Sequence, residues 1–177
     1  MRIVLVGFMA CGKTTIGELL AKRLGQRQID LDEAIVEHEG MTIPEIFAKF
    51  GEAHFRDCEH QALVRNIGQD AILTTGGGTP VRDDNANVLI NSGAPVILLD
   101  ARIDTIVSRI GDDPNRPIAS QLDPEGMAKL KESRRGQYEK VASLRIATDD
   151  LEPEEICEQI IAFAQEWNQP CLKAVSE

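Results

Sequence analysis

The sequence has few cysteines, and none lies close to another along the chain. They are Cys11, Cys58, Cys157 and Cys171, and no two form a C-x-x-C pair. Disulfide frameworks and zinc sites usually show closely spaced cysteines, and disulfides persist in oxidising compartments. The wide spacing therefore argues against both kinds of site, and predicts free thiols and a cytoplasmic location.

Long apolar runs are also missing. The longest clean runs, Ile3–Val6 and 96–99, are far too short to cross a bilayer. The first residues, MRIVLVG, contain neither a long apolar segment nor a small-residue cleavage site. We therefore expect no membrane partner and no signal peptide.

Positive charge is scarce. The chain has 19 Lys and Arg against 29 Asp and Glu, a formal net charge of −10. A surface this acidic repels a phosphate backbone, so nucleic acid is not expected as a partner.

The remaining composition is that of an ordinary globular protein. Of 177 residues, 42% are hydrophobic and 27% are charged. This length favours one domain and buries enough surface to form a core without disulfides or metal.

Apolar runs alternate with amphipathic stretches along the chain, which predicts an α/β fold. A sheet of five parallel strands is expected, covered by helices on both faces in three layers. The predicted strands are Ile3–Val6, Gln28–Asp30, 71–75, 96–99 and Leu144–Ala147. The predicted helices cover 16–24, 42–51, about 55–63, 85–92, 104–110, 124–138 and Pro153–Trp167. Ligands of such sheets bind beyond the carboxyl ends of the strands, so the residues that follow the strands are candidates for chemistry.

The segment after the first strand carries the strongest motif. Residues 7–14 read GFMACGKT, which fits G-x-x-x-x-G-K-S/T between a strand and a helix. Glycines let the backbone N–H groups curl around phosphate oxygens, and the helix N-terminus adds partial positive charge. Lys13 is then expected to reach the β- and γ-phosphates, and the Thr14 hydroxyl to bind Mg²⁺.

Two carboxylates leave the second strand. On an extended chain, Asp30 and Asp32 point to the same side. One can serve Mg²⁺ while the other faces an acceptor hydroxyl; alternatively, the pair caps a helix.

Three further features have both a functional and a structural interpretation. Arg56 can bind an anion, or it can pair with Glu52 and Glu59 on a helix surface. The glycines at 76–78 can approach a ligand or form a tight turn. Arg116 before Pro117 can reach a nucleotide from a lid or lie in solvent.

Taken together, these features resemble the shikimate kinase family over residues 3–147. The resemblance rests on Asp30-x-Asp32, residues 40–43, Ile46-Phe47, Gly51-Glu52, Phe55-Arg56, Glu59, Gly76-Gly77-Gly78 and Arg116-Pro117. It implies a P-loop kinase fold with strand order 2-3-1-4-5, in one domain over 1–167. Within that domain it implies substrate-binding helices at about 32–66 and a lid at about 112–120, followed by a tail at 168–177.

The resemblance also implies roles for individual residues. Lys13, Asp32 and Arg116 are expected to be catalytic, and Thr14 and Asp30 to hold one Mg²⁺ per subunit. ATP is expected on Ala10, Cys11, Gly12, Lys13, Thr14, Thr15, Arg109 and Arg116. Shikimate is expected on Asp32, Arg56, Gly76, Gly77, Gly78 and Arg134, with Arg135 as the competing choice for the last position.

The implied activity is transfer of a phosphoryl group from ATP to the 3-hydroxyl of shikimate, in aromatic amino acid biosynthesis, by a cytoplasmic monomer. The alternatives are a related small-molecule kinase, such as a gluconate or nucleoside monophosphate kinase, and a nucleotide-binding module without catalysis. Two departures concern the nucleotide. Many members have Gly or Ser where this chain has Ala10-Cys11, and some have an arginine before the proline at Pro153, where this chain has Glu152.

Overall fold

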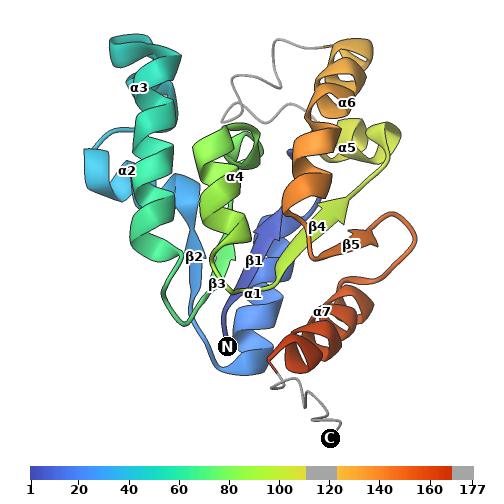
Figure 1. Cartoon of the computed structure of the whole chain (residues 1–177). Coiled ribbons are helices and arrows are strands. Elements are labelled where there is room, and N and C mark those ends of the chain that lie inside the picture. Colours follow the sequence, from blue (N-terminus) through green and yellow to red (C-terminus); the bar gives the residue numbers. More distant parts are fainter. Residues whose placement is uncertain (111–122, 169–177) are drawn as a thin grey trace, which may run out of the picture.

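The strands form one parallel sheet whose order confirms the expected topology. The computed structural model describes residues 1–110 and 123–168. In that part, the order is β2-β3-β1-β4-β5 (Figure 1). The bounds are β1 (Ile3–Val6), β2 (Gln28–Asp30), β3 (Ile72–Thr74), β4 (Val96–Asp100) and β5 (Leu144–Ala147). All four residues of β1 are buried, as expected for the central strand of a sheet covered on both faces.

Helices cover both faces of the sheet (Figure 1). On one side α1 (Lys13–Leu24) packs against α7 (Pro153–Trp167). On the other, α4 (Asp83–Ile90) lies between α3 (Ile43–Asn66) and α6 (Pro124–Val141). Three shorter elements complete the described chain: α2 (Leu31–Glu39) against α3, α5 (Ile103–Ile110) against α6, and the 3₁₀ helix η1 (Thr79–Val81) after β3.

Strand register brings the carboxyl ends of three strands to one edge. Leu5 of β1 and Asp30 of β2 both pair with Thr74 of β3. The segments that follow these three strands therefore start side by side, which is where an α/β sheet binds its ligand.

The predicted bounds of β1, β2, β5 and α7 are confirmed, and those of β3, β4 and α5 differ by a residue at their ends. No helix predicted from periodicity corresponds to α2, although α2 falls within the helices that the resemblance implied at about 32–66. The premise of an extended chain across the two carboxylates is wrong. Asp30 ends β2 and is the N-cap of α2, whereas Asp32 lies in the first helical turn, so the chain is not extended across the pair. The capping interpretation of these carboxylates is correct for Asp30.

The predicted separation of two helices at Gly51 is confirmed. The element α3 spans Ile43–Asn66, but it consists of two helices that meet at a kink at Gly51, where φ is 82° and ψ is 173°. Such a conformation suits glycine, which has no Cβ to clash at positive φ. Thr42 begins the helix with the predicted capping box.

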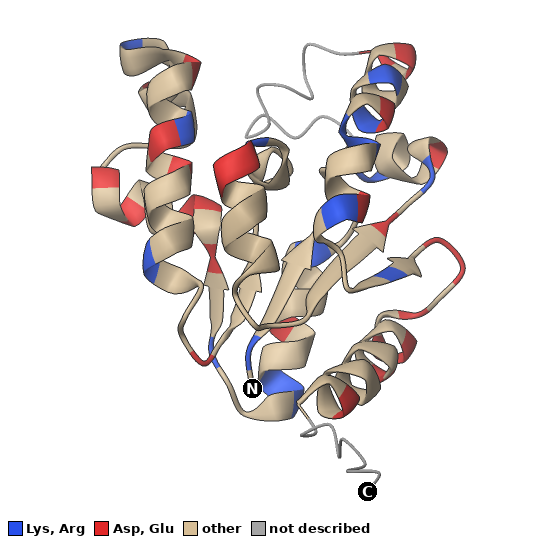
Figure 2. Cartoon of the chain, viewed as in Figure 1, with Lys and Arg blue, Asp and Glu red and all other residues tan. Residues whose placement is uncertain are grey.

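Charged side chains lie on the helices, the connecting segments, the edge strand β5 and the last residues of β2 and β4, while the interior of the sheet is apolar (Figure 2). No helix within the described ranges has the length and hydropathy of a membrane span. The predicted lid at 112–120, with Arg116, lies outside the described residues, as does the tail beyond Asn168.

Candidate active site

The loop between β1 and α1 is shaped by two glycines. Gly7 has φ 145°, and a Cβ there would lie 2.2 Å from the carbonyl oxygen of Leu99. Gly12 caps α1 with φ 97°. Ala10 adopts a left-handed φ of 56°. The backbone therefore curls ahead of the helix N-terminus, as a phosphate-binding loop requires.

The ammonium group of Lys13 is folded against this loop. Its Nζ donates to the carbonyl oxygens of Gly7 at 2.9 Å and Phe8 at 2.8 Å, and lies 3.6 Å from the sulfur of Cys11. Because that sulfur belongs to a residue only 1% exposed, Cys11 fills the inside of the loop.

The Asp30 carboxylate is held by both of its oxygens. Oδ1 accepts the backbone N–H of Asp32 at 2.9 Å and of Glu33 at 3.4 Å. Oδ2 accepts from the hydroxyls of Thr74 at 2.9 Å and Thr14 at 3.5 Å. A hydroxyl and a carboxylate are hard oxygen ligands, so Thr14 and Asp30 fit Mg²⁺ in chemistry and in proximity.

At the carboxyl edge of the sheet, the pKa of the Asp32 side chain is shifted strongly. Burial raises its pKa from 3.8 to about 6, and the negative charges of Asp30 and Glu59 add to that rise. Lys13 and Arg56 act in the opposite direction. A carboxyl group with this pKa can accept a proton near neutral pH, which suits a general base.

Arg56 forms the ion pairs of the structural interpretation and also lies where it could meet an anion. It donates to Glu52 at 3.0 Å and to Glu59 at 3.0 Å, and its guanidinium also lines the active-site cavity. Glu59 is 1% exposed and accepts a second hydrogen bond from the Thr79 hydroxyl at 2.7 Å. These bonds fix the guanidinium from one side.

None of the three consecutive glycines has a positive φ, but each lies close to neighbouring atoms. A Cβ at Gly78 would lie 2.4 Å from Arg56 Nη1, and one at Gly76 would lie 2.9 Å from Glu59 Oε1 and 3.0 Å from Asp32 Oδ1. A Cβ at Gly77 would lie 3.3 Å from the backbone nitrogen of Met9. The segment thus brings its backbone against the charged side chains, and the tight-turn interpretation is insufficient.

Arg134 and Arg135 lie in different places. Arg134 lines the same cavity as Arg56, donates to the Gly77 carbonyl at 3.3 Å, and lies over the Phe8 ring with its guanidinium carbon 5.9 Å from the ring centre. The Tyr138 hydroxyl donates to the same carbonyl, and burial raises its pKa to about 12, so it stays protonated.

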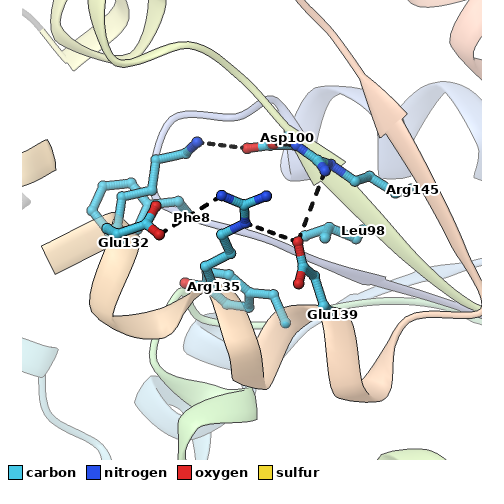
Figure 3. A pocket seen from close by; sticks show the side chains of 9 residues that line it. Phe8, Leu98, Asp100, Glu132, Arg135, Glu139 and Arg145 are labelled. Carbon is cyan, nitrogen blue, oxygen red and sulfur yellow. Dashed lines mark hydrogen bonds and ion pairs between the residues drawn. The ribbon is translucent and has the colours of Figure 1, made fainter. Parts of the chain in front are cut away.

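Arg135 belongs to an ion-pair network beside the sheet (Figure 3). Its guanidinium lies between Glu139 at 2.9 Å and Glu132 at 3.7 Å, next to a cavity of about 110 Å³. In the same network Asp100 of β4 binds Lys131 of α6 and Arg145 of β5. These ion pairs connect α6 to β4 and β5. Since Arg134 also lies on α6, they help to fix the position of its backbone.

One cavity of about 790 Å³ contains every predicted site residue within the described chain. Arg109 lies at its nucleotide end and donates to the Ala10 carbonyl at 3.3 Å. The residues brought together are Ala10, Cys11, Gly12, Lys13, Thr14, Thr15, Asp30, Asp32, Arg56, Gly76, Gly77, Gly78, Arg109 and Arg134.

Sequence reasoning missed several other lining residues. Phe47 and Phe55 face each other at 4.8 Å between ring centres and form an apolar wall, and Glu59 supplies a buried charge. All three occurred in the family motif, but helical periodicity had given them ordinary core or surface positions. Thr148 and Leu151 also line the cavity, and the Thr148 hydroxyl lies 3.5 Å from the Cys11 carbonyl oxygen. No motif pointed to Thr148, whereas Leu151 belongs to the Leu151-Glu152-Pro153 segment in which the sequence departs from some family members.

Comparison with known proteins agrees with this geometry. The family model for shikimate kinase matches residues 9–165. The shikimate kinase of Limosilactobacillus fermentum is 46% identical over 164 residues, covering 92% of this chain and 95% of that protein. That of Enterococcus faecalis is 41% identical, covering 93% and 98%.

Solved structures add the fold and a ligand complex. Shikimate kinase from Acinetobacter baumannii, in complex with shikimate, superposes with a TM-score of 0.88 at 31% identity, over 96% of this chain and 95% of that one. A gluconokinase from Sinorhizobium meliloti, with a TM-score of 0.56 at 14% identity, covers 93% and 94% and shares the fold alone. The match to the family model and the identity with these relatives show that the chain belongs to the shikimate kinase family.

Proposed function

We propose that this protein is a shikimate kinase, which transfers the γ-phosphoryl group of MgATP to the 3-hydroxyl of shikimate. The observation that carries the proposal is the position of Asp32. Its carboxyl group lines the same cavity as the phosphate loop and Arg56, and the charges of Lys13 and Arg56 both act on its pKa. This supports a base that is near both the nucleotide phosphates and an anionic acceptor.

The nucleotide phosphates are expected to be bound by positively charged and hydrogen-bond-donating groups. Backbone N–H groups of residues 10–15 and the ammonium of Lys13 are suited to hold the phosphates, after Lys13 exchanges its bonds to loop carbonyls for phosphate oxygens. Thr14 and Asp30 are the residues that would hold Mg²⁺. When bound, the ion neutralises charge on the phosphates during transfer.

The acceptor half rests on two arginines and one carboxylate. Arg56 and Arg134 are suited to bind the carboxylate of shikimate, since a guanidinium can donate two parallel hydrogen bonds to it. Phe47 and Phe55 offer an apolar wall for the ring. Asp32 is then the acceptor for the proton of the reacting hydroxyl.

The transfer itself needs little covalent help from the protein. The 3-hydroxyl oxygen forms a bond to the γ-phosphorus, and the bond from that phosphorus to the β–γ bridging oxygen breaks. The hydroxyl proton goes to Asp32, and ADP leaves with the electron pair of the broken bond. The products are shikimate 3-phosphate and ADP.

Several expectations from the sequence belong to this proposal. One kinase domain spans 1–167, with shikimate-binding helices at about 32–66 and a lid at about 112–120 that delivers Arg116 to ATP. The enzyme works as a cytoplasmic monomer with one Mg²⁺ per subunit. It is not expected to bind nucleic acid.

ADP release coupled to a spectrophotometric assay tests the activity directly. Shikimate is expected to support turnover with MgATP, whereas gluconate and nucleoside monophosphates are not. Turnover with gluconate but not with shikimate would favour the related-kinase alternative. ATP binding with no turnover on any acceptor would favour a non-catalytic module.

A further inference from the structure

Three side chains with metal-binding atoms meet where the end of α2 packs against α3. Glu39 is the last residue of α2, and His54 and Cys58 lie one turn apart on α3. His54 Nε2 is 3.5 Å from Cys58 Sγ and 3.9 Å from Glu39 Oε2. No two of the three ligand atoms are more than 4.8 Å apart. None of these residues lines the active-site cavity.

We propose that Glu39, His54 and Cys58 form a binding site for a divalent transition metal, with Zn²⁺ as the best fit. A thiolate, an imidazole and a carboxylate are its usual protein ligands. Tetrahedral zinc with bonds of about 2.0–2.1 Å to nitrogen and 2.3 Å to sulfur separates these two atoms by about 3.5 Å. The observed distance from Nε2 to Sγ already has this value. The Glu39 oxygen lies 3.9 Å from Nε2 and within 4.8 Å of Sγ, so it needs to move inward by about 0.5–1 Å to complete the site.

The residues around this cluster leave one side of it open to solvent, from which an ion can enter. The His54 side chain is 42% exposed, whereas Cys58 is 5% exposed and anchors the site on its inner side. The His54 ring packs against Phe50 with ring centres 4.7 Å apart, which limits its rotation. Three protein ligands leave a fourth tetrahedral position for water on the exposed side.

Charge and protons balance on binding. The Cys58 thiol releases its proton to solvent, and neutral His54 uses the lone pair of Nε2. The thiolate and the Glu39 carboxylate together neutralise the two positive charges of the ion. Since the ligands come from two helices, the bound ion cross-links the end of α2 to α3.

This site has no recognisable sequence motif, because its cysteine is single. His54 and Cys58 have the i, i+4 spacing that places two ligands on one helical face, but the third ligand is fifteen positions earlier, across the turn between α2 and α3. Only packing of the two helices brings Glu39 into reach.

Titration of the full-length protein with Zn²⁺ against a chromophoric chelator tests the proposal. Excess Mg²⁺ and ADP are kept present to occupy the oxygen ligands of the active site. We expect one Zn²⁺ to bind tightly per chain. His54→Ala and Cys58→Ser should each weaken Zn²⁺ binding by more than ~10–100-fold, which is the loss expected when a residue that only supports a metal ligand is removed. His38→Ala and Cys157→Ala are matched controls, a neighbouring histidine and a buried thiol elsewhere, and should bind Zn²⁺ like the wild type.

Two further measurements separate a metal site from a merely polar cluster. Co²⁺ should give a thiolate-to-metal charge-transfer band that is lost in Cys58→Ser, and Zn²⁺ should raise the midpoint of thermal unfolding in the wild type but not in His54→Ala. Because the His54 side chain is 42% exposed, its replacement should leave the fold intact, so the test stays valid even where Cys58→Ser fails to fold. Equal Zn²⁺ affinity in the wild type and in His54→Ala, or a Co²⁺ spectrum without a thiolate band, would overturn the proposal.

Discussion

Asp30 and Asp32 are joined by a hydrogen bond from the backbone N–H of Asp32 to Asp30 Oδ1, at 2.9 Å. The first carboxylate thus begins the helix that carries the second. It also raises the pKa of Asp32 through its negative charge, after the larger effect of burial. The proposed metal ligand and the proposed base are therefore coupled in geometry and in electrostatics.

This coupling predicts the behaviour of Asp30→Asn. The amide oxygen can keep the cap, so the fold should persist, but the ligand charge for Mg²⁺ is lost and a higher Mg²⁺ concentration should be needed for half-maximal rate. Removal of the charge should also lower the pKa of Asp32, so the acidic limb of the profile of kcat/KM against pH moves to lower pH. An acidic limb that stays in place would contradict the coupling.

Asp32→Asn should separate stability from activity. Turnover should fall by about 10²–10⁴-fold, the usual contribution of a general base. Because the pKa of Asp32 is about 6 in the fold and 3.8 in the unfolded chain, the fold binds this proton more tightly. Ionisation of Asp32 therefore costs stability as the pH rises from about 4 to 6. Each pH unit between the two values is worth about 1.36 kcal/mol, so the variant should be more stable than the wild type at pH 8 by up to about 3 kcal/mol.

Denaturant unfolding at pH 3.5 and pH 8 checks this prediction. The stability difference between Asp32→Asn and the wild type should be small at the lower pH and larger at the higher one. A variant that is equally stable at pH 8, or that keeps more than half of the activity, would remove Asp32 from its proposed role.

The sheet was predictable to its strand order because buried apolar runs show directly in a sequence, and the family resemblance supplied the order. Periodicity did not identify the helix α2 because it is short and because its start overlaps two carboxylates that fit an extended chain as well as a helix cap. The close approach of Gly78 to Arg56 was not predictable either, since spacing along the chain says nothing about contact between residues 22 positions apart. For the same reason, motif residues such as Glu59 and Phe47 showed their place in the cavity only once α3 was folded.

Gly78→Ala should displace Arg56 without straining the backbone. Gly78 has φ −94°, which alanine adopts readily, but the new Cβ would lie 2.4 Å from Arg56 Nη1. Loss of a charge-assisted hydrogen bond is worth about 1.5–3 kcal/mol, so the KM for shikimate should rise about 10–150-fold while the KM for ATP changes little. Gly68→Ala is the matched control because nothing lies within 4 Å of its Cβ position. Equal KM values in the two variants would show that Arg56 does not bind the acceptor.

Arg56→Lys tests the same side chain by its chemistry. An ammonium keeps the charge beside Glu59 but cannot form two parallel bonds with a carboxylate, so the KM for shikimate should rise by ~10-fold or more. Glu52→Gln is the control, since this partner of Arg56 is largely exposed and its loss should leave the KM within a few-fold. If Arg56 served only its ion pairs, Arg56→Lys would behave like this control.

The choice between Arg134 and Arg135 is decided by two alanine variants. Arg134 faces the cavity from the helix that the Asp100 network holds to the sheet, whereas Arg135 points to Glu132 and Glu139 beside the smaller cavity. Arg134→Ala should raise the KM for shikimate about 10–150-fold, because it removes a charge-assisted hydrogen bond to the substrate. The change in kcat should be smaller. Arg135→Ala should leave the KM nearly unchanged, because its ion pairs are exposed to solvent and lie away from the acceptor. Arg134→Lys should recover part of the loss by restoring the charge without the fork. A larger effect on KM in Arg135→Ala than in Arg134→Ala would reverse the assignment and require α6 to turn when the substrate binds.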